Sequence, residues 1–309
     1  MRTRHTLAAT VVTSAVAALA LTGCTTASQE TGSTPGASGD STAAAVDLDA
    51  IQQDDAVADL VPASVAEDGV LTVGSNLQYA PVEFLDADGK TPVGLDIDIA
   101  TALAKTMGLE LQVENAGFDS IIPAIGTKYE VGMSAFSVTP ERLETVDMVS
   151  YFTAGTQLAV ATGNPDGVSP DDLCGVTVGV QTGTIQQDDL TAMSTECTDA
   201  GKEAIDVLPY DSQSDVTTNL AGGKLQAMSA DSPIIAYAAE QTDGAVEALG
   251  EITDAAPYGV AVAKDDAELA KAVQAGLQKL MDDGVLAQVA DTWGSGAAVL
   301  DTAELNPAG

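Results

Sequence analysis

The segment that starts at residue 70 constrains the fold most, because strand-like and helix-like stretches alternate along it. Residues 70–73 and 82–85 are short and apolar, as strands are. Apolar side chains at four-residue spacing within 95–107 predict an amphipathic helix that ends at Gly108. Residues 109–113 then alternate as a strand does. Strands alternating with helices predict an α/β fold with a largely parallel sheet.

The same alternation continues to residue 293. We expect short helices within 48–60 and at 121–125, strands at 131–136, 176–180, 204–208, 225–230 and 259–263, and helices at 184–195, 212–221, 266–283 and 285–293, with another starting at Ser232. About 240 ordered residues suit two domains better than one core. Two α/β lobes imply a cleft, with ligands beyond the carboxyl ends of the strands.

The N-terminus has the features of a secretory signal. Arg2 and Arg4 precede an apolar run over 7–21, and small residues follow. LTGC, residues 21–24, resembles the lipobox of bacterial lipoproteins, so we expect residues 1–23 to be removed and Cys24 to carry lipid. A plain signal peptide and an N-terminal anchor helix are the alternatives.

Residues 24–64 follow the signal and begin with a Ser/Thr/Gly/Ala-rich stretch. This composition is typical of a flexible tether, whose random-coil span would be roughly 35 Å. We expect it to let the folded part move away from the membrane surface.

Composition excludes several functions. The formal net charge of −35 argues against nucleic acid, because phosphate binding needs a basic surface. The only histidine is His5, inside the signal, so no Ser-His-Asp or Cys-His mechanism and no imidazole metal site is available. No second apolar stretch approaches the ~20 residues of a membrane span. We expect neither metal nor cofactor.

Two cysteines remain besides Cys24. Disulfides persist outside the cytoplasm, so we expect Cys174 and Cys197 to form one. Two free buried thiols are the alternative.

Polar residues gather where the predicted strands end. They are Asn76, Tyr79, Ser134, Ser137, Thr184 and Asp231. Carboxyl ends of parallel strands share one edge of a sheet, so these residues are candidates for the cleft.

Arg142 belongs to the same edge. It is the only arginine after Arg4. Thr139 can cap a short helix whose first residue is Pro140, which places Arg142 in the first turn. A cation is unfavourable at a helix N-terminus, so an arginine there indicates an anion shared with the helix. A surface arginine paired with one of the many acids is the alternative.

Seven stretches follow one another between residues 70 and 294: VGSNLQYAPVEF, GLDIDIA, FDSIIPAI, SVTPER, VGVQTGT, the strand end 227–231, and PYGVAVAKDDAELAKAVQAGLQKLMDDG followed by Trp293-Gly294. Taken in order, they resemble the bacterial extracytoplasmic amino-acid-binding proteins, the family 3 solute-binding proteins of ABC importers. The resemblance implies a two-lobe, type II periplasmic-binding-protein-like fold with a ligand cleft between lobes and two hinge crossings, near 157–163 and 253–258. It implies lobe 1 at 65–160 plus 256–298, lobe 2 at 161–255, and a C-terminal tail at 299–309.

The resemblance also implies roles for the site residues. Arg142 would bind the α-carboxylate of an amino acid, helped by the backbone N–H groups of Thr184 and Ile185. Asp231 would bind the α-ammonium, helped by Ser137. Thr184 and Asp231 as simple helix caps are the alternative.

The ligand side chain would lie between Tyr79 and Phe118, although core packing of these aromatics is the alternative. Asn76 stands where relatives that bind basic amino acids often carry an acid, and Ala135 stands where many carry a serine beside Ser134. A polar ligand, neutral in preference to basic, is therefore expected.

Two smaller expectations concern side chains outside the cleft. We expect Asp96 and Asp98 to cap the helix over 96–107, and Trp293 to pack in the core.

The function implied by the resemblance is capture of an extracellular amino acid and delivery to an ABC transporter permease, without enzyme activity. The protein would be a monomer anchored to the outer face of the cell membrane through Cys24. Two alternatives stay open: a periplasmic cyclohexadienyl-type dehydratase on the same fold, and a ligand-sensing module of a receptor.

Overall fold

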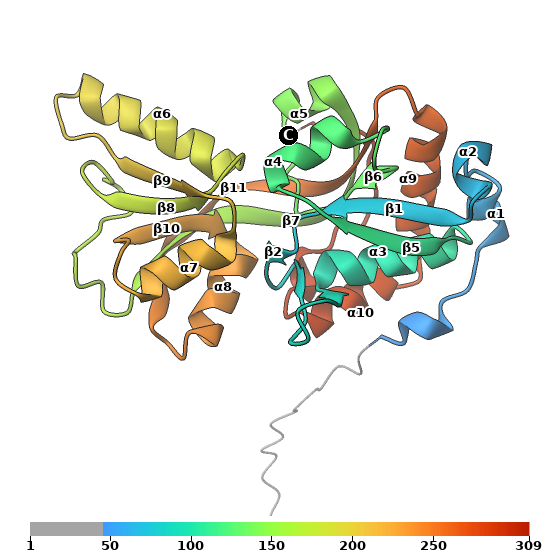
Figure 1. The fold of residues 1–309 in the computed structure, drawn as a ribbon, viewed down its shortest axis with the longest axis horizontal. Helices are drawn as coiled ribbons and strands as arrows, with labels where there is room; N and C mark the ends of the chain where they lie inside the picture. The colour runs from blue at the N-terminus through green and yellow to red at the C-terminus, as the bar shows by residue number, and fades with distance from the viewer. Residues whose placement is uncertain (1–45, 309) are drawn as a thin grey trace, which may run out of the picture. The chain divides into compact units, whose positions relative to one another are not determined.

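The computed structural model describes residues 46–308 (Figure 1). The predicted signal peptide, Cys24 and the first part of the predicted tether lie outside the described residues. Within 46–308, no helix is both long enough and apolar enough to cross a membrane.

One eight-stranded mixed sheet organises the fold, in the order β5-β1-β6-β11-β7-β10-β8-β9, with a small second sheet β2-β3-β4. The strands are β1 Val70–Ser75, β2 Gln78–Tyr79, β3 Glu83–Leu85, β4 Pro92–Val93, β5 Glu110–Asn115, β6 Val131–Gly132, β7 Val146–Ala161, β8 Thr177–Gln181, β9 Asp206–Tyr210, β10 Ala227–Asp231 and β11 Val246–Ala263. The α-helices are α1 Asp55–Ala58, α2 Ala63–Ala66, α3 Leu95–Thr106, α4 Phe118–Ile121, α5 Pro140–Thr145, α6 Ile185–Asp199, α7 Gln213–Ala221, α8 Ser232–Gln241, α9 Ala267–Asp282 and α10 Val285–Thr292, with short 3₁₀ turns at Leu48–Ala50, Ile122–Ala124 and Gly296–Ala298.

Two long antiparallel strands, β7 and β11, join the two ends of this sheet (Figure 1). At one end β11 pairs with β6, next to β1 and β5, and we call this part lobe 1. At the other end β7 pairs with β10, next to β8 and β9, and this part is lobe 2. The predicted α/β fold with two lobes is confirmed.

Strand β7 pairs with β11 in both lobes and gains β10 as a second partner at Thr156, which pairs with both Asp231 of β10 and Thr253 of β11. The pairing of β7 with β11 is irregular between Leu249 and Ala256. The first change of lobe thus lies slightly before the expected 157–163, and the second overlaps 253–258. The sequence did not predict that the crossings are long paired strands.

The amphipathic helix of lobe 1 forms as predicted. In α3, Leu95, Ile99 and Leu103 are almost fully buried. Helix α9 packs so closely on it that a Cβ added at Gly276 would lie 2.5 Å from Cδ1 of Leu103. A glycine at this position therefore sets the distance between the two helices.

Residues 46–66 pack on lobe 1, although a flexible tether was expected to reach residue 64. Val57 and Val65 are buried in the main core, and Lys105 Nζ holds the chain through the Leu48 carbonyl at 2.8 Å and Asp49 at 2.8 Å. Burial of these apolar side chains offsets the entropy of ordering this stretch.

The C-terminal tail also packs on the sheet. Val299 and Leu305 form isolated bridges with Phe152 and Val149 of β7, and Ala303 is buried. The tail thus covers part of β7 that would otherwise be exposed.

The predicted strand over 131–136 is shorter in the structure, where β6 has only two residues. Ala135 adopts a left-handed backbone with φ +49°, and its N–H donates to Asp96 Oδ2 at 2.8 Å. The strand has already ended at Gly132, and the left-handed residue at 135 prevents the extended chain from continuing to 136.

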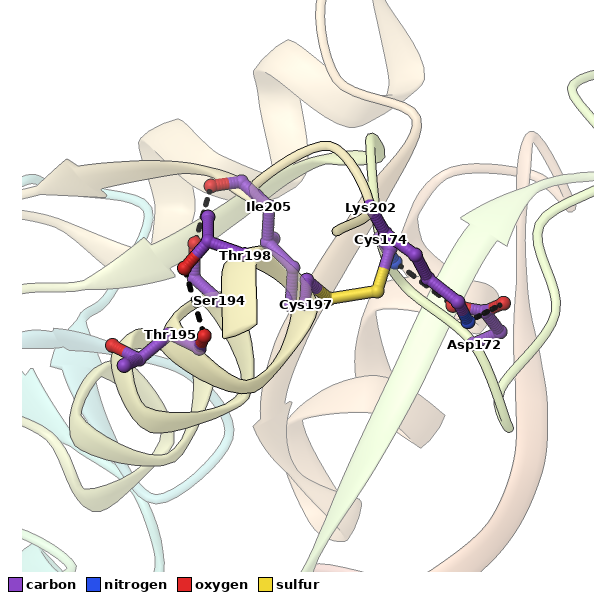
Figure 2. Close-up of a disulfide and its surroundings, with 8 residues drawn as sticks. All are labelled: Asp172, Cys174, Ser194, Thr195, Cys197, Thr198, Lys202 and Ile205. Carbon is purple, nitrogen blue, oxygen red and sulfur yellow. Dashed lines mark hydrogen bonds and ion pairs between the residues drawn. A yellow bond between two sulfur atoms is a disulfide. The ribbon is translucent and has the colours of Figure 1, made fainter. Parts of the chain in front are cut away.

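A disulfide joins Cys174 to Cys197 of α6, with a Cα–Cα distance of 5.6 Å, as predicted (Figure 2). Around it, Ser194 of α6 donates to the Ile205 carbonyl at 3.1 Å, and Lys202 pairs with Asp172 at 2.7 Å. The bond therefore ties the loop before β8 to the helix after it.

Removal of this disulfide should destabilise the protein by about 3 kcal/mol, because the bond closes a loop with a sequence separation of 23 residues. The measurement is urea unfolding of the wild type and of the double variant Cys174→Ser/Cys197→Ser. Equal unfolding free energies would show that the bond does not restrict the unfolded chain.

Candidate functional site

Arg142 is positioned by the first turn of α5. Thr139 caps this helix, because its Oγ1 accepts a hydrogen bond from the Arg142 N–H at 3.2 Å, and Pro140 is the first helical residue. Both features match the sequence prediction. The cap orients the helix start, and with it Arg142, toward lobe 2.

The Arg142 guanidinium is held by neutral groups. Nη1 donates to the Ser137 carbonyl at 2.9 Å and Nη2 to the Gly183 carbonyl at 3.4 Å. The group lies 5.5 Å from the ring centre of Phe118 and 5.4 Å from that of Phe136, within cation–π range.

None of the ion pairs formed by residues 46–308 includes Arg142. Burial lowers the pKa of Arg142 from its usual value, while the negative charge of Asp231 opposes that shift. An arginine remains charged in proteins. The site therefore contains a half-buried cation that forms an ion pair with no carboxylate of residues 46–308.

Asp231 is the opposite charge, at the end of β10. Its Oδ2 accepts hydrogen bonds from Tyr79 Oη at 2.9 Å and Tyr258 Oη at 2.7 Å, and its Oδ1 accepts from Gln186 Nε2 at 2.8 Å. Burial raises the pKa of Asp231, and these hydrogen bonds with the charge of Arg142 oppose the shift. Asp231 is at the N-cap position of α8 but makes no side-chain cap bond. The Asp231 carboxylate therefore bonds to Tyr79, Tyr258 and Gln186 and not to the backbone of α8.

A small cavity of about 10 Å³ lies between the lobes. It is lined by Tyr79, Phe118, Ala135, Ser137, Arg142, Thr184, Gln186 and Asp231. Six of the nine predicted ligand-binding residues therefore meet at one place, with a cation and a carboxylate among them.

The other three predicted residues do not line this cavity. Ser134 Oγ accepts from the Asn76 N–H at 3.0 Å and donates to Glu83 at 2.8 Å, so its hydroxyl is used inside lobe 1. Asn76 is buried and bonds across the cleft with Gln181 at 3.0 Å. Ile185 is the first residue of α6, beside the Thr184 cap.

Sequence reasoning missed two glutamines. Gln186 lines the cavity from the first turn of α6 and joins Asp231 to Thr156 Oγ1. Gln181 ends β8, and its Oε1 is buried without a partner among the described residues. Both glutamines lie within two residues of the Gly183-Thr184 pair from which Thr184 was predicted as a site residue. A polar glutamine in an acidic chain, however, gives no sequence signal that its side chain faces the cleft.

The lobes are closed against each other. Tyr79–Asp231, Asn76–Gln181 and Arg142–Gly183 hydrogen bonds cross the cleft. A Cβ at Gly183, where φ is +78°, would lie 2.8 Å from Cβ of Asp119. Since a cavity of about 10 Å³ is near the smallest space that holds one water, the cleft must open to admit anything larger.

Two buried acids lie behind the cavity wall. Glu83 Oε1 accepts from Ser134, and Asp96 accepts from the Ala135 N–H at 2.8 Å and from Tyr151 Oη at 2.6 Å. Burial, with the negative charge of Asp96, raises the pKa of Glu83 well above its usual value. Burial raises the pKa of Asp96 to about 6.

The expected helix capping by Asp96 and Asp98 is wrong. The N-cap of α3 is Gly94, with no side-chain cap bond. Asp98 accepts from Trp293 Nε1 at 2.8 Å, and Trp293 also packs edge-on against Phe84. The acids instead bind groups distant in sequence, which local spacing does not reveal.

The stability contributed by Asp96 should fall as pH rises. A carboxyl whose pKa is raised by folding holds its proton more tightly in the folded chain, so the contribution is full below about pH 4 and lost above about pH 6. The expected loss is about 3 kcal/mol. Urea unfolding of wild type and Asp96→Asn between about pH 4 and pH 7 measures it. Parallel curves of unfolding free energy against pH would contradict this assignment.

The side chains that line the interlobe cavity are of the kinds that bind a small molecule. Among residues 46–308 there is no histidine, and no group of three or more side chains of the His, Cys, Asp and Glu types could hold a metal ion. What the cavity presents is one guanidinium, one carboxylate, aromatic faces and neutral donors. Such a set can bind opposite charges of one small molecule.

The two-lobe fold and the opposite charges of Arg142 and Asp231 at one interlobe cavity are those of a binding protein, and comparison with known proteins gives its family. Residues 71–296 match the profile of the bacterial extracellular solute-binding proteins, family 3. The chain belongs to this family.

Individual relatives agree with this. The chain is 37% identical over 250 residues to the arginine-binding protein ArgT of Corynebacterium glutamicum, covering 80% of this chain and 81% of that one. Among solved structures, an ancestral amino acid-binding protein, AncCDT-1, a precursor of cyclohexadienyl dehydratase, has a TM-score of 0.67 and 31% identity over 74% of this chain and 97% of that one. An ancestral arginine-binding protein, solved with arginine and with glutamine, has a TM-score of 0.66 and 32% identity over 73% of this chain and 98% or 97% of the other.

Proposed function

We propose that this protein captures a free L-amino acid in the cleft and delivers it to the permease of an ABC transporter. The observation that carries the proposal is that Arg142 and Asp231, without an ion pair between them, line one interlobe cavity. An amino acid zwitterion carries the two complementary charges.

The ligand carboxylate would bind the guanidinium of Arg142, whose two parallel N–H donors match a carboxylate in bidentate geometry. Helix α6 begins at the same cavity, and the N–H groups of Thr184 and Ile185 at its start would add donors. The ammonium would bind Asp231 and Ser137 and displace the Tyr79 hydroxyl from its present bond with Asp231.

The ligand side chain would pack between Tyr79 and Phe118 and reach Asn76 and Gln181. The Oε1 atom of Gln181 has no partner among residues 46–308 and can accept a hydrogen bond, so a ligand side chain with an N–H or O–H donor fits best. Glu83 accepts a hydrogen bond from Ser134 and does not line the cavity, and burial with the negative charge of Asp96 raises its pKa, so Asp231 is the one acid among the lining residues. A neutral polar amino acid is therefore favoured over a basic one, and the similarity to arginine-binding relatives makes arginine the main competitor.

A thermal-shift screen of residues 46–309 against all natural amino acids tests the proposal, since a ligand that binds only the folded state raises its melting temperature. One or a few polar amino acids should stabilise the protein. No stabilisation by any amino acid would refute the function, and turnover of prephenate or arogenate would assign a dehydratase instead.

Binding would couple to motion of the lobes. We propose lobe 1 as 65–160 plus 256–298 and lobe 2 as 161–255, with bending near the irregular part of β7 and β11. The cleft opens for entry and closes around the ligand, because only the closed state lets both lobes contact it.

The location follows from the N-terminus. We propose that residues 1–23 are a lipoprotein signal and that lipidated Cys24 anchors a monomer to the outer face of the cell membrane. Mass spectrometry of the mature protein should find a lipid-modified Cys24 at the N-terminus. An intact 1–23 segment or an unmodified Cys24 would end this part of the proposal.

A further inference from the structure

A second and much larger cavity, about 680 Å³, lies in lobe 2 between α6, the loop before β8 and the middle of β11. We call it the lateral cavity and define it by Asp189, Leu190, Ser229 and Asp254. Its volume is within the range of about 300–1,000 Å³ of small-molecule sites. The proposed amino-acid site does not account for it.

The lining of the lateral cavity combines apolar surface with one sign of charge. Leu158, Leu190, Met193 and Leu249 supply the apolar part. Its ionisable side chains are all acidic: Asp171, Asp189, Glu196, Glu251 and Asp254. Because the lining is both acidic and apolar, the lateral cavity favours a cation with an aliphatic chain.

Two observations describe the polar groups that line the lateral cavity. Ser229 is 3% exposed, lines the cavity, and its hydroxyl makes no hydrogen bond within residues 46–308. Burial, with the negative charges of Asp254 and Asp188, raises the pKa of Asp189. A ligand with an N–H donor and a positive charge would satisfy both.

Two of the segments that line the cavity are joined covalently. Leu173 of the loop before β8 and Met193 of α6 both line it, and the Cys174–Cys197 disulfide links this loop to this helix (Figure 2). The disulfide restrains this part of the lining, which reduces the entropy lost on binding there.

We propose that the lateral cavity binds a small organic cation, a primary alkylammonium with an aliphatic chain. The ammonium lies between Asp189 and Asp254 and within reach of Ser229, and the chain lies on Leu190 and Met193. This site is separate from the amino-acid cleft, although Gln186 lines both cavities.

Three probes with the same chain test the proposal: hexylammonium, hexanol and hexanoate, titrated calorimetrically into residues 46–309. Hexylammonium should bind at least about tenfold more tightly than hexanol, and hexanoate should not bind. Asp189→Asn/Asp254→Asn should weaken hexylammonium binding about tenfold, as two partly exposed charge contacts would. Asp199→Asn, an exposed acid of α6 outside the cavity, is the matched control and should change nothing.

A variant of the cleft separates the two sites. Asp231→Ala should leave hexylammonium binding unchanged. If Asp231→Ala abolishes it, the cation binds in the amino-acid cleft and the proposal is overturned. Hexanol binding as tightly as hexylammonium, or an unaltered affinity in the double variant, would overturn it as well.

Discussion

Arg142→Ala should weaken binding of the amino acid by roughly 30-fold to several-thousand-fold, equivalent to about 2–5 kcal/mol. The reason is that the ligand carboxylate would be desolvated in the closed cleft without its cationic partner. The carbonyls of Ser137 and Gly183, which now accept from Arg142, cannot replace it because they repel a carboxylate. Calorimetric titration of the amino acid found in the thermal-shift screen gives the affinity.

Arg142→Lys should recover only part of this loss, because an ammonium cannot reproduce the planar pair of donors. Lys128→Ala, which removes an exposed cation outside the cavity, is the matched control for the change of net charge and should bind like wild type. An unchanged affinity in Arg142→Ala would contradict the ligand-binding role. Arg142 would then be a structural residue that only packs on Phe118 and Phe136.

Asp231→Asn should cause a loss of similar size, about 2–5 kcal/mol, by removing the charge that pairs with the ligand ammonium. An asparagine oxygen can still accept from Tyr79 or Tyr258, so the fold should persist and the melting temperature should fall little. Asp243→Asn, an acid of lobe 2 outside both cavities, is the control. The affinities come from the same titration.

The outcome for Asp231→Asn separates two roles of this carboxylate. If affinity drops while the melting temperature is kept, Asp231 acts on the ligand. If affinity is unchanged, the carboxylate serves only to hold Tyr79, Tyr258 and Gln186 in the closed cleft, and the ammonium binds elsewhere.

The sequence predicted most elements of the fold, because strands and amphipathic helices leave local periodic signals. Strand β7 escaped prediction, and only the end of β11, residues 259–263, was predicted. The middle of β11 is polar and exposed from Glu251 to Ala255, with Gly250 before it, so it does not alternate as a half-buried strand does. What makes it a strand is its long-range pairing with β7.

For the site, the sequence assigned Arg142 and Asp231 to the same cleft, because each stands at the end of a recognisable strand or in a capped helix, and both line one cavity in the structure. The sequence did not predict the two buried acids, Glu83 and Asp96, that lie behind the cavity wall. Glu83 and Asp96 are charged residues buried in lobe 1, against the usual rule for acids, and Asp96 is partnered by Ala135 and Tyr151. Only the assembled fold brings such partners together.

The central claim is that one cleft holds both charges of an amino acid. It is tested most directly by titrating the wild-type protein with the stabilising L-amino acid, its methyl ester and its deaminated acid. The account predicts that the ester, which lacks the carboxylate charge, and the acid, which lacks the ammonium, each bind at least about 30-fold more weakly than the amino acid. An ester or a deaminated acid that binds as tightly as the amino acid would contradict it.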